Sequence, residues 1–169
     1  MERENQIKRL LEHSFFQGLR PLEIKALFSA GDIRAFESGQ VLFNEGAPSD
    51  GLFFVLSGVF EVRLESKDFP LAHIKDGEVI GEVGLLSRGP RSARVEAVTE
   101  SFVWHLSREV FEGLISRGDA LAGGLLKGMA DDLCRRFREG VYEGASLMGE
   151  LAPRTAARIH NQDDEWELS

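Results

Sequence analysis

The chain has 169 residues, of which 43% are hydrophobic and 28% charged, and this is the composition of one soluble globular domain with its own core. Its net charge of -8 argues against a nucleic-acid-binding protein, because such proteins need a basic surface to displace counterions. One cysteine excludes an intrachain disulfide, and the lack of a membrane-spanning apolar run and of a signal peptide leads us to expect a cytoplasmic protein.

The first segment, residues 4–30, is predicted to be helical. Gly18 and Pro21 divide it into two pieces, with Pro21 in the first turn of the second piece, where its missing N–H is tolerated. Apolar residues recur at helical spacing through both pieces, namely Ile7, Leu10, Leu11, Phe15, Leu22, Ile24, Leu27 and Phe28.

From residue 32 to residue 106 the pattern changes to short strands separated by turns. The predicted strands are two that meet at Gly39 within residues 36–43, followed by 52–57, 59–65, 71–74, 79–80, 94–97 and 102–106. Gly39, Gly46 and Gly58 are predicted to form turns rather than ligand contacts. Many short strands with glycine turns indicate a small barrel or sandwich.

The stretch between the sixth and seventh predicted strands carries the chemistry of a binding site. Gly81 has no Cβ, so the backbone can approach a ligand closely there, and residues 82–86 are predicted to form a short helix whose first N–H groups attract an anion. Arg91 follows with a planar guanidinium that suits phosphate, and Ser92 adds a hydroxyl donor. Because Glu82 would repel the same anion, it is better suited to a sugar hydroxyl. A plainer interpretation is that Arg91 pairs with a surface acid and the glycines only turn the chain.

This stretch resembles the phosphate-binding cassette of the cyclic nucleotide-binding domain family, which includes bacterial catabolite activator proteins and regulatory subunits of cyclic-AMP-dependent kinase. The matching residues are Gly81, Glu82, Leu85, Leu86, Pro90, Arg91, Ser92, Ala93 and Val95. The resemblance implies an α+β fold, in which an antiparallel β-roll is flanked by N-terminal helices and a long C-terminal helix. It also implies that Glu82 binds the ribose 2′-OH and that Arg91 and Ser92 bind the cyclic phosphate, with backbone amides completing the cradle. The implied binding residues are Gly81, Glu82, Val83, Gly84, Leu85, Arg91, Ser92 and Ala93.

Two helices are predicted after the strands, the first over residues 108–115 and the second from Asp119, a predicted N-cap, to about Met148. The second is rich in glycine, with Gly123, Gly124, Gly128, Gly140, Gly144 and Gly149. Each glycine costs roughly 0.5–1 kcal/mol relative to alanine, so this helix should be marginal alone and should bend or fray near Gly140. Close packing against the roll or a second helix is the favoured explanation of the Gly124 and Gly128 pair.

In the family, this helix covers the base of the nucleotide and often forms a dimer seam. The resemblance therefore implies that Arg136 and Phe137 form a base lid. The alternative is a solvated arginine face that pairs with acids one turn away, made of Asp131, Asp132, Arg135, Arg136 and Arg138. An apolar stripe from Leu126 to Met148 suits either the surface of the roll or a dimer seam, and we expect a homodimer.

The expected organisation is one cyclic nucleotide-binding domain over residues 1–151, helical from 108 to 150. Residues 152–169 form an acidic tail that we expect to be disordered, with Trp166 and Leu168 as an alternative docking motif. This tail is too short for a helix-turn-helix domain, which needs about three helices of its own.

The favoured function is a stand-alone receptor for a cyclic nucleotide, whose C-terminal helix moves on binding and signals to a separate effector protein. Cyclic AMP is favoured over cyclic GMP, although the Ser92 hydroxyl suits a guanine amino group as well. No nucleic acid, membrane or metal is expected as a partner, and no cofactor other than this ligand.

Two other classes of function are weighed against the receptor. The first is a ligand-free interaction module of the same fold, which would commonly lack Glu82 or Arg91. The second is a metal-dependent β-barrel enzyme, which would need histidines clustered with acids at ligand spacing. The histidines are instead scattered singly as His13, His73, His105 and His160, so no catalytic activity is expected and His73 and His105 are interpreted as packing or surface residues.

Overall fold

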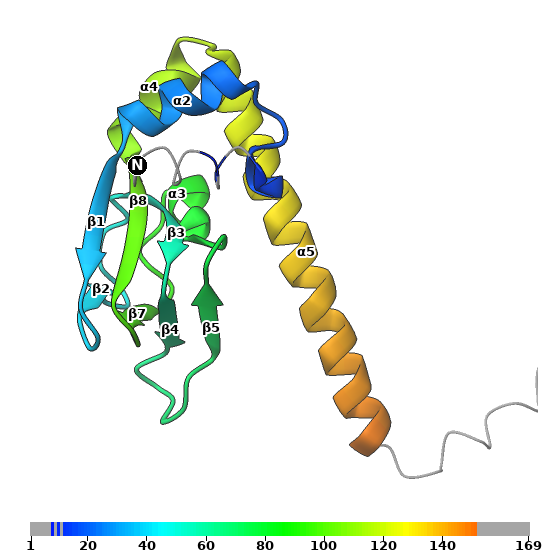
Figure 1. Cartoon of the computed structure of the whole chain (residues 1–169). Helices are drawn as coiled ribbons and strands as arrows, with labels where there is room; N and C mark the ends of the chain where they lie inside the picture. The colour runs from blue at the N-terminus through cyan, green and yellow to red at the C-terminus, as the bar shows by residue number, and fades with distance from the viewer. Residues whose placement is uncertain (1–7, 9, 11, 152–169) are drawn as a thin grey trace, which may run out of the picture. The chain divides into compact units, whose positions relative to one another are not determined.

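Two four-stranded antiparallel sheets form the centre of the computed structural model, which describes residues 8, 10 and 12–151. The strands are β1 (Asp32–Phe36), β2 (Val41–Phe43), β3 (Gly51–Ser57), β4 (Val59–Arg63), β5 (Ala72–Lys75), β6 (Val79–Ile80), β7 (Arg94–Ala97) and β8 (Ser101–Ser107). One sheet has the order β1-β8-β3-β6 and the other β2-β7-β4-β5 (Figure 1). This arrangement confirms the predicted antiparallel roll.

The helices are η1 (Ser14–Phe16), α2 (Pro21–Ala30), α3 (Glu82–Ser87), α4 (Arg108–Ser116) and α5 (Ala120–Leu151). Pro21 is the first residue of α2, as predicted. Asp119 caps α5, because its carboxylate accepts the N–H of Leu121 at 3.0 Å. None of the helices that the structure describes is long and apolar enough to cross a membrane.

The chain divides into two compact units, Met1–Asp132 and Leu133–Ser169, so that α5 begins in the first and ends in the second. Helix α5 continues through Gly140 to Leu151, although fraying was predicted there. The predicted helical residues 4–7, 9 and 11 and the predicted acidic tail at 152–169 lie outside the described residues.

Strand β3 is buried on both faces, which explains its continuous apolar sequence. Because successive side chains of a strand point to opposite faces, Phe53 and Val55 face the space between the two sheets, whereas Leu52, Phe54 and Leu56 face the helices. The turn glycines predicted on either side of this strand are confirmed, since Gly39, Gly46 and Gly58 have φ values of +85°, +75° and +102°.

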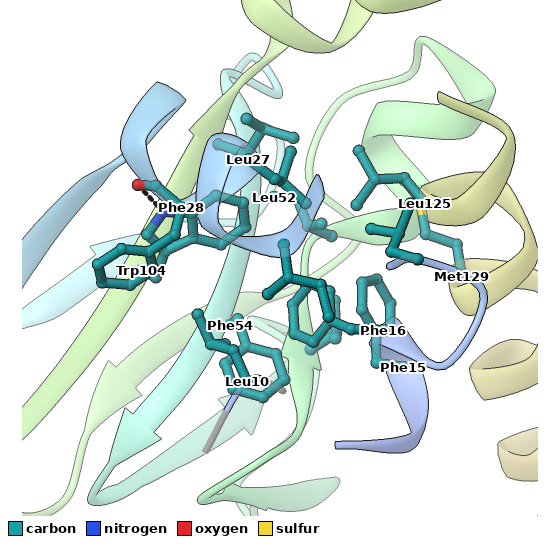
Figure 2. Packing of buried hydrophobic residues seen from close by; sticks show 14 of the residues in the cluster. Leu10, Phe15, Phe16, Leu27, Phe28, Leu52, Phe54, Trp104, Leu125 and Met129 are labelled. Carbon is teal, nitrogen blue, oxygen red and sulfur yellow. Dashed lines mark hydrogen bonds between the residues drawn. The ribbon is translucent and has the colours of Figure 1, made fainter. Parts of the chain in front are cut away.

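A large apolar cluster joins this outer face of the sheet to the helices (Figure 2). Trp104 of β8 is 1% exposed, stacks on Phe28 of α2 and donates its indole N–H to the Phe28 carbonyl at 3.1 Å. Leu125 and Met129 bring the first half of α5 into the same cluster. The helices of the first unit are therefore anchored to the sheet that carries β3 and β8.

The glycines at the start of α5 serve as points of close approach. A Cβ on Gly128 would collide with the carbonyl oxygen of Phe15, and a Cβ on Gly124 would collide with the side chain of Leu19. The predicted close packing of this pair is confirmed, and the partner is the segment formed by η1 and the turn after it. Gly123 differs, because no atom of the described residues lies within 4 Å of the place where its Cβ would stand.

This contrast predicts opposite effects of two neighbouring substitutions on stability. Gly123→Ala is expected to raise the free energy of unfolding by about 0.5–1 kcal/mol, because alanine is the better helix former and there is room for its methyl group. Gly128→Ala is expected to lower it by about 1–3 kcal/mol, because the Phe15 backbone must move. Urea unfolding of both variants is the measurement, and effects of the same sign would contradict the packing described here.

Candidate functional site

The site is built where β6 ends and α3 begins, at a backbone position that requires glycine. Gly81 has φ +91° and ψ 7°, a left-handed conformation, and it is the N-cap of α3. A Cβ on this residue would collide with Nη1 of Arg91 and would lie 3.1 Å from the carbonyl oxygen of Gly51. Gly81 therefore allows the Arg91 side chain to pass directly beneath the start of α3.

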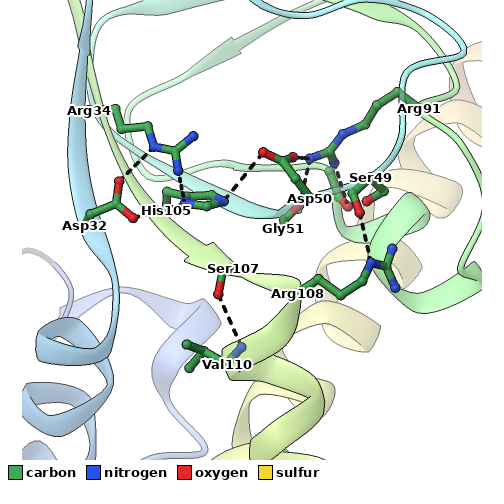
Figure 3. A network of polar contacts seen from close by, with 11 residues as sticks. Asp32, Arg34, Ser49, Asp50, Gly51, Arg91, His105, Ser107, Arg108 and Val110 are labelled. Atoms are coloured by element: carbon green, nitrogen blue, oxygen red, sulfur yellow. Dashed lines mark hydrogen bonds and ion pairs between the residues drawn. The ribbon is translucent and has the colours of Figure 1, made fainter.

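Arg91 is held in place by a carboxylate and two carbonyls, although it is only 2% exposed. Its Nη2 donates to Oδ1 of Asp50 at 2.6 Å and to the carbonyl of Gly51 at 2.9 Å, and its Nη1 donates to the carbonyl of Gly81 at 3.3 Å (Figure 3). The Phe43 ring lies 4.1 Å from the guanidinium carbon and adds a cation–π contact. This side chain is therefore held in one orientation before any ligand arrives.

One nitrogen of this guanidinium makes no hydrogen bond to the residues that the structure describes. The Nε of Arg91 is buried and has no hydrogen-bond partner among the described residues. Burial lowers the pKa of Arg91, and the hydrogen bond and charge of Asp50 oppose that shift. The buried N–H and the incompletely compensated positive charge both suit an anionic oxygen.

Glu82, the first residue of α3, is brought to the same site. It is 4% exposed, and its charge acts on Arg91. A buried carboxylate is an acceptor, so Glu82 suits a hydroxyl donor, whereas Arg91 suits an anion. The structure thus gathers Gly81, Glu82 and Arg91, the residues on which the sequence prediction placed most weight.

The other predicted binding residues take varied positions. Val83 is 46% exposed and Gly84 is buried, both on α3, and Ser92 is exposed. Leu85 and Ala93 are 2% and 7% exposed, so their side chains belong to the interior, and the Leu85 amide is already bonded to the Gly81 carbonyl at 3.2 Å.

The predicted base lid lies in the second unit. There Phe137 is 73% exposed and Arg136 partly buried. Their role over a ligand stays a prediction.

Arg108 is a site residue that the sequence analysis missed. Its Nε donates to the carbonyl of Ser49 at 2.8 Å, and its Nη2 donates to the carbonyl of Gly84 at 2.9 Å. It also reaches the Leu85 carbonyl at 3.4 Å and pairs with Glu112 at 3.3 Å. One guanidinium therefore ties α4 to the end of α3 and to the loop that precedes β3. The only sign of this role in the sequence was the position of Arg108, directly after the last strand.

The interpretation of the histidines needs one refinement. His105 is 3% exposed and lies beside Asp50 in the network around Arg91 (Figure 3). The His73 side chain is instead 47% exposed and pairs with Glu61. Within residues 12–151, no group of three or more His, Cys, Asp or Glu side chains is arranged to hold a metal ion.

Comparison with protein families gives a match that centres on this site. The model of the cyclic nucleotide-binding domain matches residues 33–117, half of the chain. The cyclic AMP receptor protein of Thermus thermophilus is 34% identical over 145 residues, which cover 84% of this chain and 65% of that protein. A cAMP-dependent protein kinase regulatory subunit of Emericella nidulans is 34% identical over 106 residues, covering 63% of this chain and 26% of that protein. The chain thus spans between about a quarter and just under two thirds of these two curated relatives.

Solved structures agree with this match. A cyclic nucleotide-binding domain from Methylobacillus flagellatus superposes with a TM-score of 0.71 at 26% identity, covering 80% of this chain and 78% of that one. The catabolite activator protein of Thermus thermophilus gives a TM-score of 0.65 at 33% identity, covering 79% of this chain and 62% of that one.

Proposed function

Because the chain belongs to the cyclic nucleotide-binding domain family, we propose that it is a receptor that binds one purine cyclic nucleotide and signals to a separate partner protein. The observation that carries this proposal is the buried Arg91, whose Nε has no hydrogen-bond partner in the described part of the chain, together with the buried Glu82. A cyclic nucleotide offers one anionic phosphodiester and one ribose hydroxyl close together. These are the two groups that a guanidinium and a carboxylate bind.

In this proposal the cyclic phosphate takes its main contact from Arg91. Asp50 keeps part of the guanidinium charge compensated, so an entering phosphate meets a side chain that needs no reorganisation. The exposed Ser92 hydroxyl and the backbone amides at the start of α3 complete the phosphate contacts, and Glu82 accepts the hydrogen bond of the ribose 2′-OH. The Leu85 and Ala93 side chains contribute by packing α3 and the residue before β7 against the interior rather than by touching the ligand.

We further propose that binding alters the position of α5. The ligand must bind two arrangements of the helix with different affinities for such a switch to operate. Arg136 and Phe137 are the proposed base lid, and the exposed Phe137 ring is an apolar surface that a purine would cover. A homodimer formed through the same helix is part of this proposal, and so is an effector protein that reads the helix position.

Cyclic AMP is the favoured ligand. The names of the bacterial and fungal relatives specify cyclic AMP, and both are 34% identical to this chain over the matched residues. The single cysteine favours a reducing compartment, so the receptor is proposed to act in the cytoplasm. We propose that it acts by binding and does not catalyse a reaction.

Calorimetric titration of the nucleotide-stripped full chain tests this function. Cyclic AMP is expected to bind with a dissociation constant of about 1 μM or below, corresponding to about −8 kcal/mol, and cyclic GMP more weakly. Linear 5′-AMP is the matched control, because it carries the same base and sugar but no ring phosphodiester.

The opposite outcome is equally informative. If neither cyclic nucleotide produces heat or raises the melting temperature, the receptor proposal is wrong. The chain would then be a ligand-free interaction module of the same fold.

A further inference from the structure

His105 occupies a place inside the roll that packing alone does not explain. It lies on β8 opposite Phe53 of β3 on one side and Asp32 of β1 on the other, and its ring stacks on the Phe53 ring with centroids 4.6 Å apart. It is 3% exposed, yet both ring nitrogens face charged side chains (Figure 3). A buried imidazole among charges changes its surroundings when it gains a proton.

The Nδ1 atom of His105 has two partners with opposite requirements. Nη2 of Arg34 lies 2.6 Å from it, and Oδ1 of Asp32 lies 3.1 Å from it. A guanidinium only donates and a carboxylate only accepts. Neutral His105 with a bare Nδ1 therefore accepts from Arg34, whereas protonated His105 donates from Nδ1 to Asp32. The ring thus has two alternative hydrogen-bond arrangements, which differ by one proton.

The Nε2 atom of His105 connects these arrangements to the anion site. It is buried without a hydrogen-bond partner among the residues that the structure describes, and it lies 4.0 Å from Oδ2 of Asp50. The other oxygen of the same carboxylate, Oδ1, accepts from Arg91 at 2.6 Å. Asp50 therefore stands between His105 and the guanidinium proposed to bind phosphate.

The charged groups around the ring determine the sign of the effect. Strand β1 supplies Asp32 and Arg34, the segment before β3 supplies Asp50, and β3 itself supplies only the apolar Phe53. Burial raises the pKa of Asp32, but its hydrogen bonds with Arg34 and His105 outweigh this and hold that pKa below its ordinary value. Two carboxylates that favour a cationic ring thus face one arginine that opposes it.

Protonation of His105 places the new proton on Nδ1 and a positive charge on the ring beside Asp50, whose Oδ2 the Nε2–H faces in both states. Asp50 is then shared between two cations, so Arg91 is compensated less and the positive potential at the anion site rises. This added charge favours a bound phosphodiester. By linkage, a bound phosphodiester favours the protonated ring to the same extent.

We propose that His105 is a positioning residue that acts on Arg91 through Asp50, so that the receptor binds its cyclic nucleotide more tightly when His105 is protonated. This inference rests on the proposed function. It extends that function by making the affinity depend on pH, with a rise as His105 gains a proton.

The test is a pH profile of cyclic AMP affinity, measured by calorimetry on the full chain between about pH 8 and about pH 5. The phosphodiester keeps its single negative charge throughout this range, so a change in affinity reports on the protein. We expect wild-type affinity to increase about fivefold towards the acidic end, a modest coupling between two sites. Titrations in buffers of different ionisation enthalpy should show proton uptake on binding.

Two substitutions and one matched control locate the effect. His105→Asn and His105→Gln each place an uncharged amide group near the position of one ring nitrogen of the original histidine. Both variants should bind cyclic AMP with an affinity that does not change with pH. His73→Asn, at the exposed histidine on β5, should retain the wild-type slope. A slope that persists in both folded His105 variants, or that disappears in the His73 variant, would overturn the assignment to His105.

The wild-type profile separates the two proposals even if neither His105 variant folds. Binding that stays constant across the pH range would overturn the role of His105 while leaving the receptor function intact. Absence of binding at every pH would instead refute the receptor function.

Discussion

Replacing Arg91 with alanine is expected to weaken cyclic nucleotide binding by about 2–5 kcal/mol, as expected for the loss of one partner from a desolvated charge pair. The reason is the near-complete burial of this guanidinium, whose unpartnered Nε and held orientation both favour the phosphodiester. Calorimetry with cyclic AMP measures the loss. Arg91→Lys should recover only part of it, because an ammonium keeps the charge but not the planar set of donors.

Arg88 supplies the matched control for this experiment. It caps the C-terminal end of α3, its side chain is 80% exposed, and it pairs with Glu112 at 3.7 Å. Arg88→Ala removes an arginine from the same stretch without touching the buried cluster, so it should leave the affinity unchanged. If Arg88→Ala weakens binding as much as Arg91→Ala does, the assignment of the phosphate to Arg91 is wrong.

Replacing Glu82 with glutamine is expected to weaken cyclic AMP binding by about 1.5–3 kcal/mol, the contribution of a hydrogen bond to a charged group. Glutamine keeps the size and shape of this buried side chain, so α3 should retain its structure, and equal melting temperatures in the absence of ligand would show this. The measurement is again the calorimetric affinity for cyclic AMP.

The ribose contact is isolated by using 2′-deoxy cyclic AMP as a second ligand. This ligand lacks the hydroxyl proposed to donate to Glu82, so the wild type and Glu82→Gln should bind it with the same affinity. A double-mutant cycle between residue and hydroxyl then yields the interaction energy of that pair. Additive effects of the two changes would show that Glu82 acts elsewhere than on the 2′-OH.

The strands and the cassette were predictable because their signals are local. Gly39 and Gly58 adopt a left-handed backbone, which favours glycine. A glycine between two stretches of strand-like sequence therefore indicates the turn at which one strand ends and the next begins. The proximity of Gly81, Glu82 and Arg91 was also predictable. These residues lie close together in one short stretch, and that stretch resembles the binding cassette of a known family. The gathering of these three residues at the start of α3 therefore needed no tertiary reasoning.

Contacts that cross between distant segments were not predictable in the same way. Asp50 and Arg108 are charged residues in ordinary loop and helix positions, and only the pairing of β3 with β8 brings Asp50 to Arg91 and Arg108 to α3. His105 was interpreted as packing or surface because one isolated histidine carries no pattern. Its surroundings become visible only when the register of β1 against β8 is known.

Neither sheet can be completed until the last two strands of the roll have been synthesised. Strand β8 pairs with both β1 and β3, and β7 pairs with both β2 and β4. The strands synthesised first therefore lack these partners until the last strands have been synthesised. A fold closed by such distant partners is expected to form slowly, because a long loop must be ordered before these pairings contribute. On the ribosome, the continuous apolar sequence of β3 remains without its main partner during this delay. That strand is therefore the segment most exposed to aggregation in the cell, and the yield of folded protein should depend on chaperones that shield it.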